Sequence, residues 1–138
     1  MTKKETIWRN ILHEALTKRT NIFTQKNIAE QFHYSTSTVH NALKIPRELG
    51  AIEVTGRFFR LRDFEKFLLI WATQRHITRD IIYQTAVDAS PQKIEGSMPP
   101  NTIFGAFSAY RLKYEESPAD YDTIYIYSND LEATKQRF

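Results

Sequence analysis

Apolar residues recur at helical spacing along the first third of the chain. Within residues 5–19 they fall on one face of a helix, at Ile7, Ile11, Leu12, Ala15 and Leu16. Residues 24–32 and 35–44 show the same spacing, and each segment begins with a threonine or serine of the kind that caps helices. The pattern therefore predicts three helices, with a short strand at residues 22–23.

The spacing changes from helical to strand-like after residue 50. Residues 52–54 and 57–61 predict two strands, and the glycine between them allows a tight turn. Pro46 should kink or end the preceding helix near Lys44, because proline lacks an amide hydrogen and its ring clashes with the preceding turn. The apolar spacing nevertheless continues to Leu49 and favours a further helical turn.

Residues 63–76 form the most apolar predicted helix, with Asp63 as its N-cap. A helix that is apolar on most of its faces is expected to be buried. It either packs within the chain or forms a dimer interface, and we favour packing within the chain.

The remaining residues predict a small α/β domain. Residues 81–87 suit a strand or an apolar helical segment, and Ser90 followed by Pro91 starts a helix that ends near Met98. The later expected elements are an extended segment at 102–104, a helix at 108–112, a loop at 115–120, a strand at 123–127 and a helix at 130–138.

The charge is distributed unevenly. Residues 1–62 carry eleven Lys or Arg and five Asp or Glu, a net charge of +6. Residues 63–138 carry eight and eleven, a net charge of −3. A basic first half beside an acidic second half indicates that only the first half meets a polyanion. A solvated surface with chance asymmetry is the alternative.

The polar face of residues 35–44 carries side chains that suit a DNA-binding helix. Short hydroxyl and amide side chains near a helix N-terminus can read base edges in the major groove, and Asn41 suits bidentate pairing with adenine. The candidate DNA contacts on this helix and the following hairpin are Thr36, Ser37, Thr38, His40, Asn41, Lys44, Thr55, Arg57 and Arg60. Alternatively, the hydroxyl groups only cap the helix and face water.

The order of these segments resembles a known DNA-binding family. Residues 24–29, 37–44 and 48–53 are similar to the winged helix-turn-helix domain of prokaryotic transcription regulators, and the resemblance covers residues 5–62. Pro46 departs from the leucine usual at its position. The resemblance implies that the helix from about Ser35 to Lys44 enters the major groove of double-stranded DNA. We expect a homodimeric, sequence-specific transcription regulator.

A second resemblance lies in the carboxy-terminal half. Phe104-Gly105-Ala106, followed by Asp120-Tyr121-Asp122-Thr123, is similar to the minimal nucleotidyltransferase pattern. In that superfamily a glycine turn holds a nucleoside triphosphate and two aspartates on one strand bind a divalent metal. The resemblance implies nucleotide or metal contacts at Gly105, Ser108, Asp120 and Asp122. Asp120 and Asp122 share a side only if both lie in a strand.

Ala106 departs from the small polar residue of that family, so we favour a degenerate domain over an active nucleotidyltransferase. Winged helices joined to such domains also resemble antitoxin-type repressors of abortive-infection systems. The expected fold class is therefore α+β: a winged helix-turn-helix domain at residues 1–62, a linking helix at 63–76 and a small α/β, nucleotidyltransferase-like domain at 77–138.

The chain lacks the residues that several classes of chemistry require. The chain has no cysteine, which excludes disulfides and thiolate catalysis. The four histidines show no i,i+4 pairing and have no carboxylate at ligand spacing, so we expect no metal site. Nothing in the sequence resembles a catalytic triad, and we expect no cofactor and no enzymatic activity. The longest apolar run, residues 67–72, is too short to span a bilayer, and no export signal is recognised, so we expect a cytoplasmic protein.

Three functions stay open. The protein is a DNA-binding regulator, a nucleotidyltransferase guided by a winged helix, or a protein-interaction module that uses the apolar helix at residues 64–71. The carboxy-terminal domain is a further candidate for contact with a protein partner. We favour the first, because the helix-turn-helix spacing coincides with the basic half of the chain.

Overall fold

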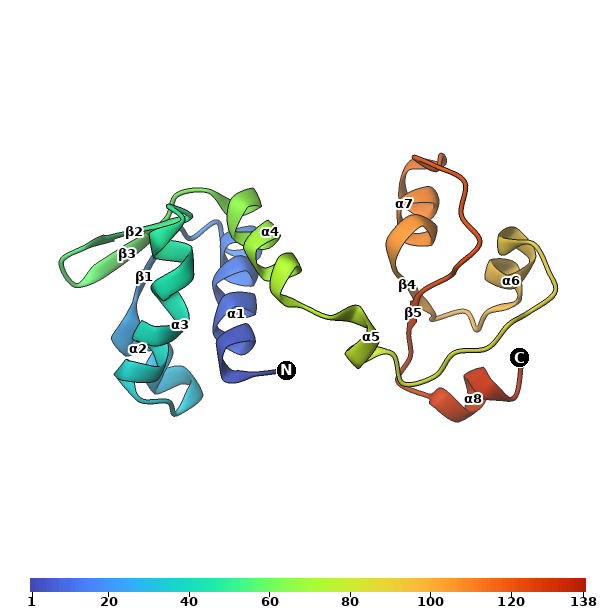
Figure 1. Ribbon diagram of the computed structural model, residues 1–138, viewed down its shortest axis with the longest axis horizontal. Coiled ribbons are helices and arrows are strands. Elements are labelled where there is room, and N and C mark those ends of the chain that lie inside the picture. Colours follow the sequence, from blue (N-terminus) through green and yellow to red (C-terminus); the bar gives the residue numbers. More distant parts are fainter. The chain divides into compact units, whose positions relative to one another are not determined.

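The computed structural model describes residues 1–138, which divide into two compact units, residues 1–80 and 81–138. Helices and small antiparallel sheets occur in both units, so the fold is of the mixed α+β class (Figure 1). The sequence-based boundaries at residues 62 and 76 differ from this division, because the apolar helix that follows residue 63 packs into the first unit.

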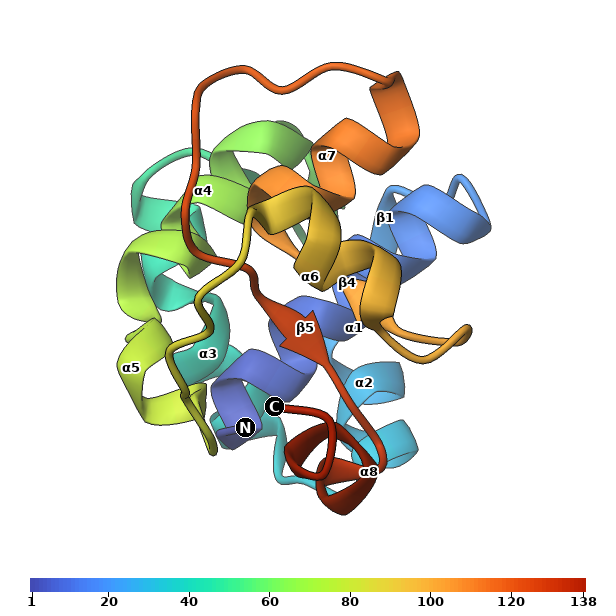
Figure 2. The same cartoon turned by 90° about the vertical axis from the view of Figure 1, so that its right-hand side faces the viewer.

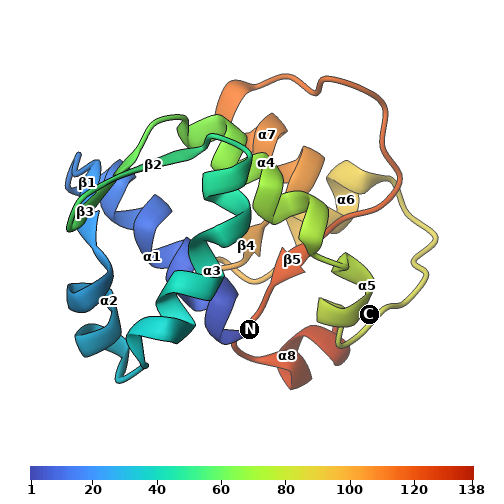
Figure 3. The ribbon, with the colours of Figure 1, turned by 60° about the vertical axis from the view of Figure 1, so that its left-hand side comes forward.

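The first unit combines helices with a three-stranded sheet. Its elements are α1 (Lys3–Thr17), β1 (Ile22–Thr24), α2 (Gln25–Phe32), α3 (Thr36–Glu48), β2 (Ile52–Thr55), β3 (Phe58–Leu61), α4 (Phe64–Gln74) and α5 (Ile77–Asp80). The strands are antiparallel in the order β1-β3-β2. Figure 3 shows α1 passing beside α3, and Figure 1 shows the β2–β3 hairpin extending away from the helices.

The core of the first unit is built from α1, α3, the sheet and α4. Trp8, Val39, Phe59 and Phe67 are each at most 1 % exposed. The rings of Trp8 and Phe67 meet edge to face with their centroids 5.7 Å apart, which fixes α4 against α1. Burying one such side chain contributes roughly 1.5–3 kcal/mol, so this cluster dominates the stability of the unit. The apolar helix therefore packs within the chain through Phe67 and Ile70, as favoured from the sequence, whereas Leu68 and Leu69 on its other side are exposed.

The helix starts carry the expected caps. Thr24, Ser35 and Asp63 each accept a hydrogen bond from the backbone amide three residues further on, at 3.1, 3.2 and 2.8 Å. The first amides of a helix have no partner within it, and such caps satisfy them. Three helices therefore begin where the sequence indicated.

Pro46 does not end α3 near Lys44, because the helix continues to Glu48. Proline at this position cannot donate to the carbonyl of Ala42, one turn earlier. The indole Nε1 of Trp8 donates to that oxygen instead, at 2.7 Å. The carbonyl left without a helical partner is thus satisfied from α1, and the helix gains the further turn that the apolar spacing indicated.

The second unit contains short elements. These are α6 (Pro91–Ser97), β4 (Ile103–Phe104), α7 (Ala106–Tyr114), β5 (Ile126–Tyr127) and α8 (Leu131–Lys135). The expected strand or helix at residues 81–87 is absent, and the strand expected at 123–127 is confined to its last two residues. Figure 2 shows the long irregular segment between α7 and β5.

The buried residues of the second unit are polar. They are Glu95, Ser108 and Thr134, whereas every apolar side chain of this unit keeps more solvent contact than those of the first unit's core. Two-residue strands and short helices place few apolar positions on a common face, which explains the wrong assignment at residues 81–87. Cohesion of this unit therefore depends strongly on polar contacts.

Candidate nucleic-acid interface

The outer face of α3 gathers most of the polar residues singled out from the sequence. Thr36, Ser37, His40, Asn41 and Lys44 are all exposed. Their spacing of three and four residues places them on one side of the helix. The opposite side is formed by Val39, Ala42 and Leu43, which are buried in the core. The helix is therefore fixed with a polar, cation-bearing face turned to solvent.

The hydroxyl groups at the start of α3 have two different roles. Ser35 Oγ lies 2.9 Å from both Ser37 Oγ and Thr38 Oγ1, and it accepts the amide of Thr38 at 3.2 Å. Thr38 is half-buried, so its hydroxyl belongs mainly to the cap. Thr36 makes no side-chain hydrogen bond within the chain and remains available to an external group.

The β2–β3 hairpin carries the other predicted contacts. Thr55, Arg57 and Arg60 are exposed, and Gly56 forms the turn with a φ of +59°. Arg62 pairs with Glu53 at 2.8 Å, whereas Arg57 and Arg60 form no ion pair. The hairpin thus presents two cations whose charge is not offset by a carboxylate.

The start of α1 adds residues that the sequence analysis missed. Thr2, Lys3 and Lys4 line a groove together with three residues of α3, which are Thr38, Asn41 and Ala42. Thr2 and Glu5 form a capping box. This Thr-x-x-Glu pattern in the sequence would have indicated that the helix starts before residue 5. The groove places two lysines beside the N-terminal half of α3.

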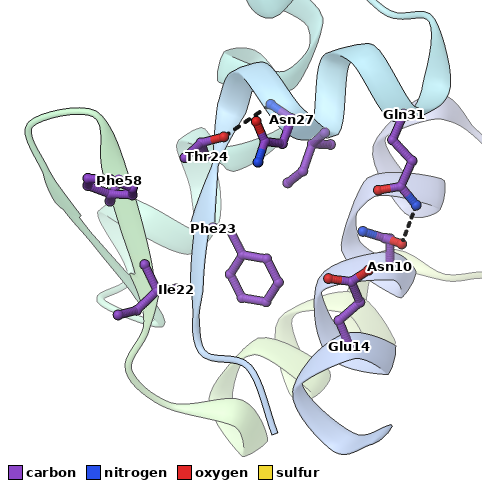
Figure 4. A pocket seen from close by; sticks show the side chains of 9 residues that line it. Asn10, Glu14, Ile22, Phe23, Thr24, Asn27, Gln31 and Phe58 are labelled. Atoms are coloured by element: carbon purple, nitrogen blue, oxygen red, sulfur yellow. Dashed lines mark hydrogen bonds between the residues drawn. The ribbon is translucent and has the colours of Figure 1, made fainter. Parts of the chain in front are cut away.

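A second hollow lies between α1, α2 and the strands β1 and β3 (Figure 4). Gln31 Nε2 donates to Asn10 Oδ1 across it at 3.1 Å, and Phe23 forms part of its wall. Its carboxylate, Glu14, pairs with Lys18 at 3.0 Å. The lining contains no lysine or arginine, so this hollow does not suit phosphate binding.

The residues of the nucleotidyltransferase-like pattern do not form the expected strand pair. Asp120 and Asp122 are exposed and lie in irregular chain before β5, so the condition that both share a strand is not met. Asp122 Oδ1 accepts from the hydroxyl of Thr123 at 2.8 Å. Among residues 1–138 no three His, Cys, Asp or Glu side chains cluster closely enough to hold a metal ion.

Gly105 and Ser108 take structural places in the second unit. The amide of Gly105 donates to the carbonyl of Tyr125 at 2.8 Å. A Cβ at Gly105 would lie 3.3 Å from the ring of Tyr127, so glycine permits the close approach of the two segments. Ser108 is 1 % exposed, because it lies on the inner side of α7 rather than toward solvent.

A buried carboxylate joins the elements of the second unit. Glu95 accepts a hydrogen bond from the hydroxyl of Tyr121 at 2.7 Å and forms an ion pair with Arg111. Arg111 Nε also donates to the Tyr121 oxygen, at 3.0 Å. Burial by itself would raise the pKa of Glu95, but the bonds from Tyr121 and Arg111 outweigh it and hold the pKa below its ordinary value. No sequence motif indicated this cluster.

Comparisons with protein-family models, curated proteins and solved structures gave no match. No helix of the structure combines the length and the apolar character needed to cross a bilayer. The geometry of the first unit is therefore the main basis for a functional proposal.

Proposed function

We propose that this protein is a sequence-specific DNA-binding transcription regulator of the winged helix-turn-helix type. The order α1-β1-α2-α3-β2-β3 and the antiparallel sheet β1-β3-β2 suit such a domain, with the β2–β3 hairpin as the wing. The observation that carries the proposal is the exposed polar face of α3, because its opposite face is anchored in the core.

In this proposal the N-terminal half of α3 enters the major groove of double-stranded DNA. Asn41, with His40 and Thr36 beside it, reads base edges by hydrogen bonding. Lys44 and the hairpin arginines contact phosphates and set the register of the helix. The protein acts as a homodimer in the cytoplasm on paired half-sites, and it performs no catalysis.

A second candidate is an antitoxin-type repressor, with an inactive nucleotidyltransferase-like second unit that contacts a protein. Its support is the β4–β5 ribbon, where Ile103 and Tyr127 are directly opposite and are 61 % and 71 % exposed. An apolar pair of this kind is a candidate for partner contact. If the partner is a second copy, sedimentation equilibrium should report a dimer that Ile103→Ser with Tyr127→Ser weakens. A monomeric wild type would count against the homodimer.

Enrichment of random duplexes on the purified protein tests the main proposal. We expect recovery of one preferred sequence, in paired half-sites if a dimer binds. A pool that remains random after repeated rounds, with no duplex retained at low salt, would remove the proposal. A random pool that is nevertheless retained would indicate phosphate binding without base readout.

A further inference from the structure

The groove between the start of α1 and α3 has the composition of an anion site. It is lined by Thr2, Lys3 and Lys4 on one side and by Thr38, Asn41 and Ala42 on the other. Figure 3 shows the amino terminus of α1 beside α3. The groove thus adjoins the face of α3 that the proposed function places against DNA, and it shares Asn41 with that face.

The two ammonium groups are held in place by neutral partners. Lys3 Nζ lies 5.2 Å from the ring centroid of Tyr34, the residue that precedes the N-cap of α3. Lys4 Nζ lies 5.0 Å from the ring of Trp8 and donates to the side-chain oxygen of Gln74. Aromatic rings and an amide oxygen orient a cation without neutralising its charge. By contrast, Lys18 and Lys26 of this unit pair with carboxylates.

The carboxylate in the first turn of α1, Glu5, is already engaged. Glu5 Oε2 accepts from the backbone amide of Thr2 at 2.7 Å, and Glu5 Oε1 faces Trp71 on α4 and Arg75, which directly follows that helix. The capping box also satisfies the amide of Glu5 through Thr2 Oγ1. The positive character of the groove therefore comes from the lysine side chains rather than from free amides at the end of α1.

We propose that this groove binds a phosphodiester group of the DNA backbone, at Lys3 and Lys4, beside the major groove entered by α3. This inference rests on the proposed DNA-binding function and adds a contact that the sequence analysis did not assign. The hairpin arginines follow the carboxy-terminal end of α3, whereas the two lysines adjoin its N-terminal half. The DNA backbone is thus contacted both beside the N-terminal half of α3 and by the hairpin, and two separate contacts fix the register in which the side chains of α3 meet the bases.

The test compares two charge-matched double variants across a salt series, with anisotropy of a labelled duplex as the readout. Lys3→Gln with Lys4→Gln removes the two groove charges but keeps the side-chain stems against Tyr34 and Trp8. Lys18→Gln with Lys66→Gln removes two charges elsewhere on the same unit. Each lost phosphate contact lowers the log–log salt slope by about one.

We expect the groove variant to lose about two units of slope per bound protomer, equally on all sequences, while the control keeps the wild-type slope. Lys3→Gln alone should lose about one unit, and Lys3 is exposed, so its replacement leaves the fold intact. Wild-type slopes in both groove variants, or equal losses in groove and control variants, would overturn this inference alone. Absence of salt-dependent binding by the wild type would instead overturn the proposed function.

Discussion

The indole Nε1 of Trp8 donates a hydrogen bond of 2.7 Å to the carbonyl oxygen of Ala42, across 34 positions of sequence. This oxygen is the one that Pro46 leaves without a helical donor. The bond therefore ties α1 to the middle of α3 and allows α3 to extend past the proline. It also fixes the orientation of the exposed polar face, because Trp8 is fully buried in the core.

Replacing Trp8 by Phe should destabilise the first unit by roughly 2–4 kcal/mol. The substitution leaves the carbonyl of Ala42 unsatisfied and removes buried ring volume. Denaturant unfolding followed by far-UV circular dichroism measures the effect. Trp71→Phe is the matched control, since Trp71 is half-buried and its Nε1 is 3.5 Å from Glu5, and it should cost far less.

A double-mutant cycle with Pro46→Ala isolates the role of the hydrogen bond. Alanine at position 46 supplies the amide hydrogen that proline lacks, so it can donate to Ala42 when the indole is gone. The double variant should therefore be more stable than the sum of the two single effects predicts. Simple additivity would show that the indole bond and the proline are not coupled.

Asn41→Ala and Lys44→Ala should alter DNA binding in different ways. Loss of a base-reading amide costs about 1–3 kcal/mol on the preferred duplex and relaxes the preference at one base pair. Loss of the Lys44 charge should weaken all duplexes alike. Competition binding with single-base variants of the enriched duplex separates the two results. An unchanged preference in Asn41→Ala would assign base readout to other residues.

The second unit should lose structure on acidification. The pKa of Glu95 is lowered in the folded protein, so its ionised carboxylate stabilises the second unit at pH values above the unfolded pKa, whose ordinary value is 4.5. This stabilisation is lost as the pH falls through the folded pKa. Tyr121→Phe removes a hydrogen bond to the carboxylate and should move the acid transition to higher pH. Tyr110→Phe, at an exposed tyrosine on α7, should leave the acid transition unchanged.

Tyrosine and tryptophan signals can follow the two units separately. Both tryptophans lie in the first unit, whereas six of the seven tyrosines lie in the second. Near-UV circular dichroism in the tyrosine region therefore follows the acid unfolding of the second unit. The midpoint of the acid titration should move to higher pH in Tyr121→Phe and should not move in Tyr110→Phe. Equal midpoints in all three proteins would contradict the stabilising role of Tyr121.

Denaturant should unfold the second unit before the first. The second unit buries only polar residues, whereas the first buries a continuous apolar cluster that includes Trp8, Phe59 and Phe67. The tyrosine signal should consequently change at a lower denaturant concentration than tryptophan fluorescence. Coincident transitions from both signals would instead indicate one cooperative unit.

Features set by neighbouring residues could be predicted from the sequence. The caps at Thr24, Ser35 and Asp63 and the glycine turn at residue 56 depend on three or four adjacent positions, and the structure confirms them. The polar face of α3 also follows from local spacing, although its contact with DNA stays a prediction.

Features that depend on residues far apart in the sequence could not be predicted from it. Continuation of α3 past Pro46 depends on an indole from another helix, and the groove beside Asn41 depends on how α1 crosses α3. The Glu95 cluster likewise joins segments that no local pattern relates. The apolar composition of residues 81–87 suggested a regular element, but the unit offers no apolar core for it to complete.

Titration of ¹⁵N-labelled protein with the enriched duplex tests the central claim most directly, because it reports which surface meets DNA. The account predicts that backbone amide shifts change on the N-terminal half of α3, at the tip of the β2–β3 hairpin and around Lys3 and Lys4. Changes confined to residues 81–138, or no changes at a protein concentration well above that needed for binding, would contradict it.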